Sequence, residues 1–110
     1  MVRLSAGSGT GRRGDSATVN QALRLDITGV VQGVGFRPFV HRLALRHGLS
    51  GWVRNTSGEV QVEIEGSESA IDEFLEALEK EAPPLARIEQ VQARPSRPNG
   101  LGDFSILESA

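Results

Sequence analysis

A glycine-rich segment beside one arginine contains the residues of this chain best suited to chemistry. Residues 29–39 read Gly-Val-Val-Gln-Gly-Val-Gly-Phe-Arg-Pro-Phe. Glycine permits positive φ and lets a ligand approach backbone N–H groups, and the first turn of a helix leaves N–H donors unpaired. The guanidinium of Arg37 adds a permanently charged planar fork that matches phosphate oxygens. If a strand precedes this segment and a helix follows it, consecutive N–H groups can surround a tetrahedral anion.

The expected phosphate cradle consists of Gln32, Gly33, Val34, Gly35, Phe36 and Arg37. A sharp turn without a ligand explains the same glycines equally well, because glycine-rich connections between strands and helices are common. Asn55 is the second candidate, since its strand is expected to lie beside the first strand and to end near the loop. Its amide could then orient a water molecule, although asparagine before a turn usually caps the local backbone.

The elements around these residues follow from the hydrophobic pattern. From Leu23 apolar and polar residues alternate, which predicts a half-buried strand. Pro38 is well placed as the first residue of a helix that ends before Gly48. Strands near 49–55 and 59–65, joined by a turn, predict a hairpin with one solvated face. Trp52, within that hairpin, is expected to pack in the core.

A second helix and two more strands complete the predicted fold. Ser67 or Ser69 can cap the helix, which runs to about Glu81 with a solvated acidic face. Strands near 87–94 and 102–107 follow, and the spacing of Ile88 and Val91 suggests a bulge in the first of them. The order β α β β α β with an added strand predicts an α+β fold, a ferredoxin-like split βαβ sandwich with two helices on one face of an antiparallel sheet.

Composition narrows the classes of function. The chain has 110 residues, 14 of them acidic and 12 basic, which argues against a nucleic-acid partner. It has no cysteine, and His41 and His47 lie six positions apart, so neither a metal site nor a cofactor is expected. No segment approaches the roughly 20 apolar residues of a membrane span, and a cytoplasmic location is the default expectation. Residues 1–21 are glycine-rich without an apolar period, which predicts a flexible tail before a domain at 22–109.

Two motifs resemble the signatures of the acylphosphatase family: Gly29-x-Val-Gln-Gly-Val-x-Phe-Arg37 and Gly51-Trp-Val-Arg-Asn55. The resemblance covers residues 22–109 and implies that this domain hydrolyses acyl phosphates without metal and releases inorganic phosphate. It also implies that Arg37 binds the phosphoryl group, that residues 32–37 cradle its oxygens, and that Asn55 positions the attacking water. One departure is a hairpin after Asn55 that is one residue shorter than the family pattern, which puts its register in question.

A finer resemblance points to the N-terminal domain of the hydrogenase maturation carbamoyltransferases. It is carried by residues 36–40, by Pro83-Pro-Leu-Ala-Arg-Ile88 and by the ending Phe104-Ser-Ile-Leu-Glu-Ser-Ala. It implies carbamoyl phosphate as the substrate and downstream domains of a larger protein as partners. A module that binds carbamoyl phosphate or phosphate without turnover and a free-standing acylphosphatase are the alternatives.

Overall fold

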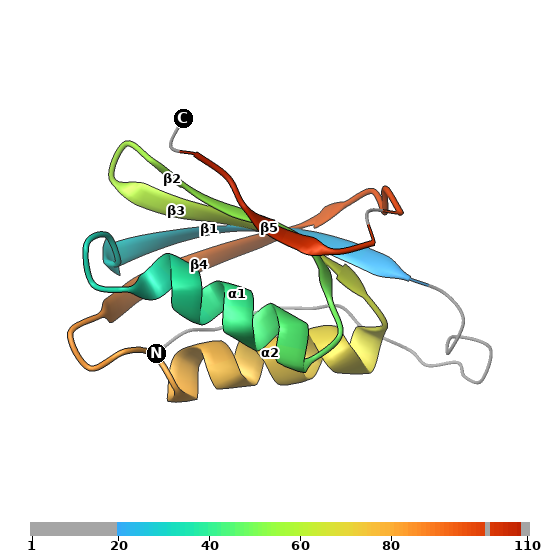
Figure 1. The fold of residues 1–110 in the computed structure, drawn as a ribbon, viewed down its shortest axis with the longest axis horizontal. Helices are drawn as coiled ribbons and strands as arrows, with labels where there is room; N and C mark the ends of the chain where they lie inside the picture. Colours follow the sequence, from blue (N-terminus) through green and yellow to red (C-terminus); the bar gives the residue numbers. More distant parts are fainter. Residues whose placement is uncertain (1–19, 101, 109–110) are drawn as a thin grey trace.

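The structure, a computed structural model, describes residues 20–100 and 102–108. Its elements, in chain order, are β1 (Gln21–Val30), α1 (Phe36–Arg46), β2 (Ser50–Thr56), β3 (Glu59–Gly66), α2 (Glu68–Lys80), β4 (Arg87–Ser96) and β5 (Phe104–Ile106). Both helices lie on the same face of the sheet, as predicted (Figure 1). Most of the predicted tail lies outside the described residues, and the prediction is wrong at Gln21, which belongs to β1.

The sheet has the order β4-β1-β3-β2-β5. β1 pairs antiparallel with β3 and β4, and β2 pairs antiparallel with β3, whereas β5 runs parallel to β2. The ferredoxin-like fold is therefore confirmed, but the fully antiparallel sheet is not. The expected pairing of β1 with β2 is wrong as well. The tight β2–β3 hairpin lets β3 pair with β1 and moves β2 one strand farther out.

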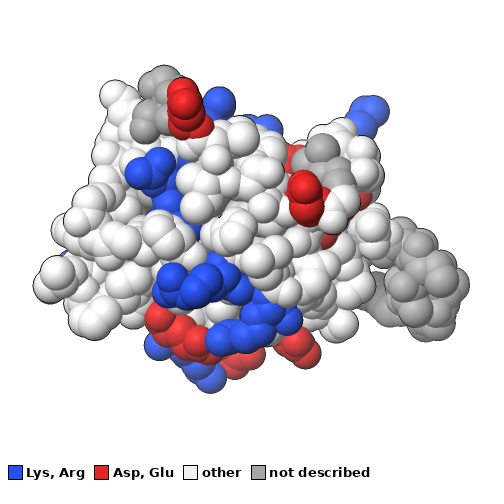
Figure 2. Space-filling view, viewed as in Figure 1, with Lys and Arg blue, Asp and Glu red and all other residues white. Residues whose placement is uncertain are grey.

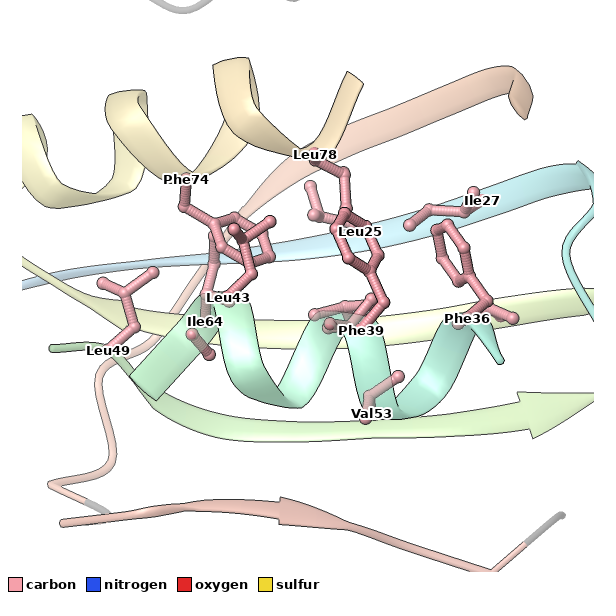
Figure 3. Packing of buried hydrophobic residues seen from close by; sticks show 14 of the residues in the cluster. Leu25, Ile27, Phe36, Phe39, Leu43, Leu49, Val53, Ile64, Phe74 and Leu78 are labelled. Carbon is pink, nitrogen blue, oxygen red and sulfur yellow. The ribbon is translucent and has the colours of Figure 1, made fainter. Parts of the chain in front are cut away.

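The core lies between the helices and the sheet, where side chains from every layer converge (Figure 3). Leu25 and Ile27 of β1, Phe36 of α1 and Phe74 of α2 have exposed fractions of 1% or less. Burying a side chain of this size contributes about 1.5 to 3 kcal/mol to stability. The alternation that predicted β1 thus holds, and Phe36 fixes the start of α1 against the core.

Helix ends depart slightly from the prediction. The Oγ of Ser67 accepts a hydrogen bond from the Ala70 N–H at 3.2 Å, so Ser67 caps α2 and Ser69 lies inside it. α1 begins at Phe36, and Pro38 is its third residue rather than its first. Proline is tolerated there because the N–H of that position has no partner within the helix.

The polar side of β3 is not the solvated face that alternation predicted. Glu63 and Glu65 are only 3% and 4% exposed. Glu63 accepts hydrogen bonds from the Arg24 guanidinium and the Ser96 hydroxyl, both at 2.8 Å. Glu65 accepts from the backbone N–H groups of the segment after β4, at 2.8 to 3.2 Å. Charged partners and a covering loop therefore bury these carboxylates on the face opposite the helices.

Trp52 lies on this same face, opposite the helices, and not in the core. The guanidinium groups of Arg24 and Arg54 stack on its ring, 4.9 and 5.2 Å from the ring centroid. The prediction failed because neighbouring residues of a strand face opposite sides, and Val53 is the fully buried one. The two arginines protect the indole from water through cation–π contacts.

The predicted bulge in β4 is confirmed. Thr28 pairs with Gln90 and Gly29 with Ile88, which leaves Glu89 as the extra residue.

None of the described helices is long and apolar enough to cross a membrane.

Candidate active site

The segment between β1 and α1 lies at the end of the sheet where the β2–β3 hairpin turns (Figure 1). Gly33 and Gly35 have φ of +74° and +79°, and Gly35 is the N-cap residue of α1. A Cβ at either position would meet nothing within 4 Å. The backbone conformation, rather than crowding, therefore favours glycine at both positions, and the space beside them is open.

The backbone N–H donors of this loop are free of partners within the described ranges. No N–H from Gln32 to Arg37 donates a hydrogen bond to another residue that the structure describes. Helical pairing starts only at Phe39, whose N–H donates to the Gly35 carbonyl at 3.2 Å. α1 has no acidic residue in its first turn and no side-chain cap. The partial positive charge at this helix end is thus uncompensated, which suits an anion.

Arg37, the second residue of α1, is half-buried at the same helix end. Within the described part of the chain it forms no hydrogen bond and no ion pair. Its guanidinium is consequently available to a ligand. A partner carboxylate, which would compete with phosphate for the same donors, is not among the described neighbours.

Asn55 is the next-to-last residue of β2 and shares the helix-facing side of the strand with Val53. Its Oδ1 is buried and has no hydrogen-bond partner among the described residues. An unpaired buried acceptor costs about 1 to 3 kcal/mol, so this oxygen is a good acceptor for a donor such as water. Because β2 ends at the same end of the sheet as the loop, Asn55 belongs to the same region.

Gln32 connects these two parts of the site. Its Nε2 donates to the carbonyl of Thr56 at 2.8 Å and to the carbonyl of Glu59 at 2.9 Å. The loop is thereby tied to the residue after Asn55, although β3 separates β1 from β2. The sequence predicted only a backbone contribution from Gln32, because the carbonyls that close a hairpin cannot be recognised without its register.

The shorter hairpin does not disturb this arrangement. Thr56 pairs with Glu59, and only Ser57 and Gly58 lie between them. Gly58 has φ of +83°, which suits a tight turn. The pairing of β2 with β3 continues from Ser50 to Thr56 without a shift, so Asn55 keeps its place.

Charge is divided between the two helices. Basic side chains gather over α1 and acidic ones beside them over α2 (Figure 2). An ion pair between the Arg46 guanidinium and the Glu81 carboxylate, 2.8 Å apart, connects the basic and acidic regions. The Nδ1 of His47 lies 3.5 Å from the Glu73 carboxylate. Burial, and to a lesser extent repulsion from Glu68, raises the pKa of Asp72 above its ordinary value.

The acidic face of α2 is exposed, as predicted. No group of three or more potential metal ligands occurs in the described ranges.

Comparisons with known proteins give one consistent family. The sequence model described as Acylphosphatase matches residues 23–106. Carbamoyltransferase HypF2 of Cupriavidus necator is 48% identical over 80% of this chain, which spans 11% of that protein. An acylphosphatase of Nocardioides is 39% identical, and the match covers 87% of this chain and 97% of the relative.

A solved structure agrees with the sequences. Full-length HypF in its phosphate- and nucleotide-bound form is 39% identical, with a TM-score of 0.80 over 82% of this chain and 12% of that one. The chain thus covers only a small part of the carbamoyltransferases that it resembles but nearly all of a free-standing acylphosphatase. On the family match, the identities and the shared fold, this chain belongs to the acylphosphatase family.

Proposed function

We propose that this chain hydrolyses acyl phosphates to a carboxylate and inorganic phosphate. The observation that carries the proposal is the run of N–H groups from Gln32 to Arg37, at the start of α1, for which the described residues provide no acceptor. Such a run, with one unpaired guanidinium, suits the three terminal oxygens of a phosphoryl group. Membership of the acylphosphatase family supports hydrolysis as the reaction.

Each part of the site has a role in the proposed mechanism. Arg37 and the loop amides neutralise charge on the equatorial oxygens of the phosphoryl group in the transition state. The Oδ1 of Asn55 accepts a hydrogen bond from water and turns a lone pair of that water toward phosphorus. The bond from phosphorus to the water oxygen forms as the bond to the acyl oxygen breaks.

The leaving group explains why so few side chains suffice. A carboxylate is a stable anion, so its departure needs no strong general acid. Neither motif offers a dedicated general base, and the proton of the attacking water passes to the phosphate or to solvent. Positioning and electrostatic stabilisation then account for most of the rate enhancement.

Carbamoyl phosphate is the proposed natural substrate. Its support is the 48% identity to a protein named carbamoyltransferase. The remaining parts of such a protein are the proposed partners, since the chain spans 11% of that relative. Calorimetry with a non-hydrolysable analogue, combined with phosphate-release assays on carbamoyl and benzoyl phosphate, tests the proposal. Affinity for the analogue without turnover of either compound would instead indicate a binding module.

Substitution of Arg37 is the sharpest test of the site. We expect Arg37→Ala to reduce phosphate release from benzoyl phosphate by about 1,000-fold or more, because it removes the charge that stabilises the transition state. Arg37→Lys should recover little, since an ammonium cannot bind two oxygens in a planar fork. Arg97→Ala, at an exposed position beyond β4, is the control and should retain full activity. Turnover within threefold of wild type in Arg37→Ala, with the fold intact by circular dichroism, would contradict the assignment.

A further inference from the structure

The cradle has little internal structure to hold its shape. Gly33 and Gly35 adopt left-handed conformations, and the backbone donors from 32 to 37 have no acceptor in the described chain. Glycine loses more conformational freedom on ordering than any other residue. A loop of this kind needs an external attachment if it is to keep its donors pointed at one place.

The side chain of Gln32 provides such an attachment. Its amide group uses both hydrogens, one on the Thr56 carbonyl at 2.8 Å and one on the Glu59 carbonyl at 2.9 Å. These two residues are the closing pair of the hairpin, and only Ser57 and Gly58 separate them. One amide therefore fastens the loop to both strands at once.

The attachment point lies beside the other half of the site. Thr56 follows Asn55 directly, and both belong to β2. Hydrogen bonds from Gln32 to this hairpin consequently fix the loop relative to Asn55 as well as relative to the sheet. In the sheet, β3 lies between β1 and β2, so no ladder hydrogen bond joins these two strands directly.

We propose that Gln32 is a positioning residue whose side chain clamps the phosphate cradle to the β2–β3 hairpin and sets the geometry between the cradle and Asn55. The inference rests on the proposed function. The Gln32 side chain touches no reacting atom and acts through the backbone of its own loop. Because the clamp orders the loop before the ligand arrives, the ordering cost does not reduce ligand affinity.

Gln32→Met tests the clamp, since methionine has a similar shape but no donor. Inorganic phosphate, titrated in a calorimeter, is the probe. We expect its Kd to rise about tenfold, which corresponds to about 1.4 kcal/mol. We also expect backbone order parameters of Gly33 and Gly35 to fall and kcat for benzoyl phosphate to decrease. Gln61→Met is the matched control, because Gln61 lies in the same hairpin and accepts two hydrogen bonds from Arg54 at 3.2 Å on the sheet face opposite the helices.

Gln32→Glu provides a second, independent variant. The carboxylate introduced in this variant cannot donate to the two carbonyls, and it repels phosphate. The Kd of inorganic phosphate should therefore rise more in Gln32→Glu than in Gln32→Met. A phosphate Kd within twofold of wild type in Gln32→Met, or an equal loss in Gln61→Met, would overturn the clamp. Retained phosphate affinity in Arg37→Ala would instead contradict the proposed function, so the two failures are distinguishable.

Discussion

At the scale of single residues, the glycines between β1 and α1 serve two different purposes. Gly29 has φ of +131°, and a Cβ there would lie 2.1 Å from the Arg87 carbonyl oxygen. Gly33 and Gly35 face open space, where a Cβ would meet no atom within 4 Å. Gly29 thus allows the close approach of β4 at its bulge, whereas the other two shape the proposed cradle. In the sequence, all three glycines belong to one motif, which does not reveal this difference between them.

Asn55 is expected to separate turnover from binding. In Asn55→Ala we expect kcat for benzoyl phosphate to fall about 100-fold or more, because the water loses its orientation. The Kd of inorganic phosphate should stay within about twofold. Thermal stability should not decrease greatly, since the variant removes a buried acceptor that has no described partner. Steady-state kinetics, phosphate calorimetry and thermal denaturation measure the three quantities, and a Kd that rises as much as kcat falls would assign Asn55 to binding.

At the scale of elements, the proposed site lies where three chain segments end together. β1 runs into the loop, α1 starts from it, and β2 finishes beside it at the hairpin. Side chains that do not contact the substrate hold each segment in place. Those of Phe36 and Val53 are buried in the core, and that of Gln32 forms a hydrogen bond to the hairpin. The functional groups therefore lie next to rigid structure, which favours precise positioning.

The start of α2 offers a test of element stability that is separate from the site. We expect Ser67→Ala to lower the free energy of unfolding by about 1 kcal/mol, because the Ala70 N–H loses its acceptor. Ser67→Asp should restore stability. Ser69→Ala is the control, since Ser69 lies inside the helix and should change stability little. Urea denaturation measures all three variants, and equal losses at 67 and 69 would argue against the cap.

The helices and strands themselves were largely predictable from the sequence, but the order in which the strands pair in the sheet was not. Alternation in β1, the stop at Gly48 and the bulge near Ile88 depend on local residue patterns, and the structure agrees with each. The position of β3 between β1 and β2, and the parallel β5, depend on long-range pairing that one sequence does not encode visibly. The same limit explains the misplaced Trp52 and the unrecognised acceptors of the Gln32 side chain.

At the scale of the whole molecule, the separation of charge bears on how an anion reaches the site. α1 contains arginines at 37, 42 and 46 and no acidic residue, and α2 carries the acidic face. Arg46 is paired with Glu81, whereas Arg42 is exposed and forms no ion pair with another described residue. α1, which starts at the proposed cradle, thus carries positive charge and no acidic residue of its own, and its field favours the approach of an anion.

Reversing one charge on this surface should slow substrate capture. We expect Arg42→Glu to lower kcat/KM about three- to fivefold at an ionic strength of about 0.01 M, where the Debye length is about 30 Å. The difference should vanish near 1 M salt, and kcat should not change. Arg97→Glu makes the same charge change beyond β4 and serves as control. A loss that persists at high salt would indicate a direct role of Arg42 instead of a long-range one.

The bulge in β4 has a consequence for how copies of this chain behave in concentrated solution. β4 and β5 are the two edges of the sheet, and an edge with regular unpaired N–H and C=O groups can recruit a strand from another molecule. β4 is irregular at Glu89 and lacks an N–H at Pro95, and β5 has only three residues. Both edges therefore carry features that disfavour intermolecular strand pairing by the folded domain.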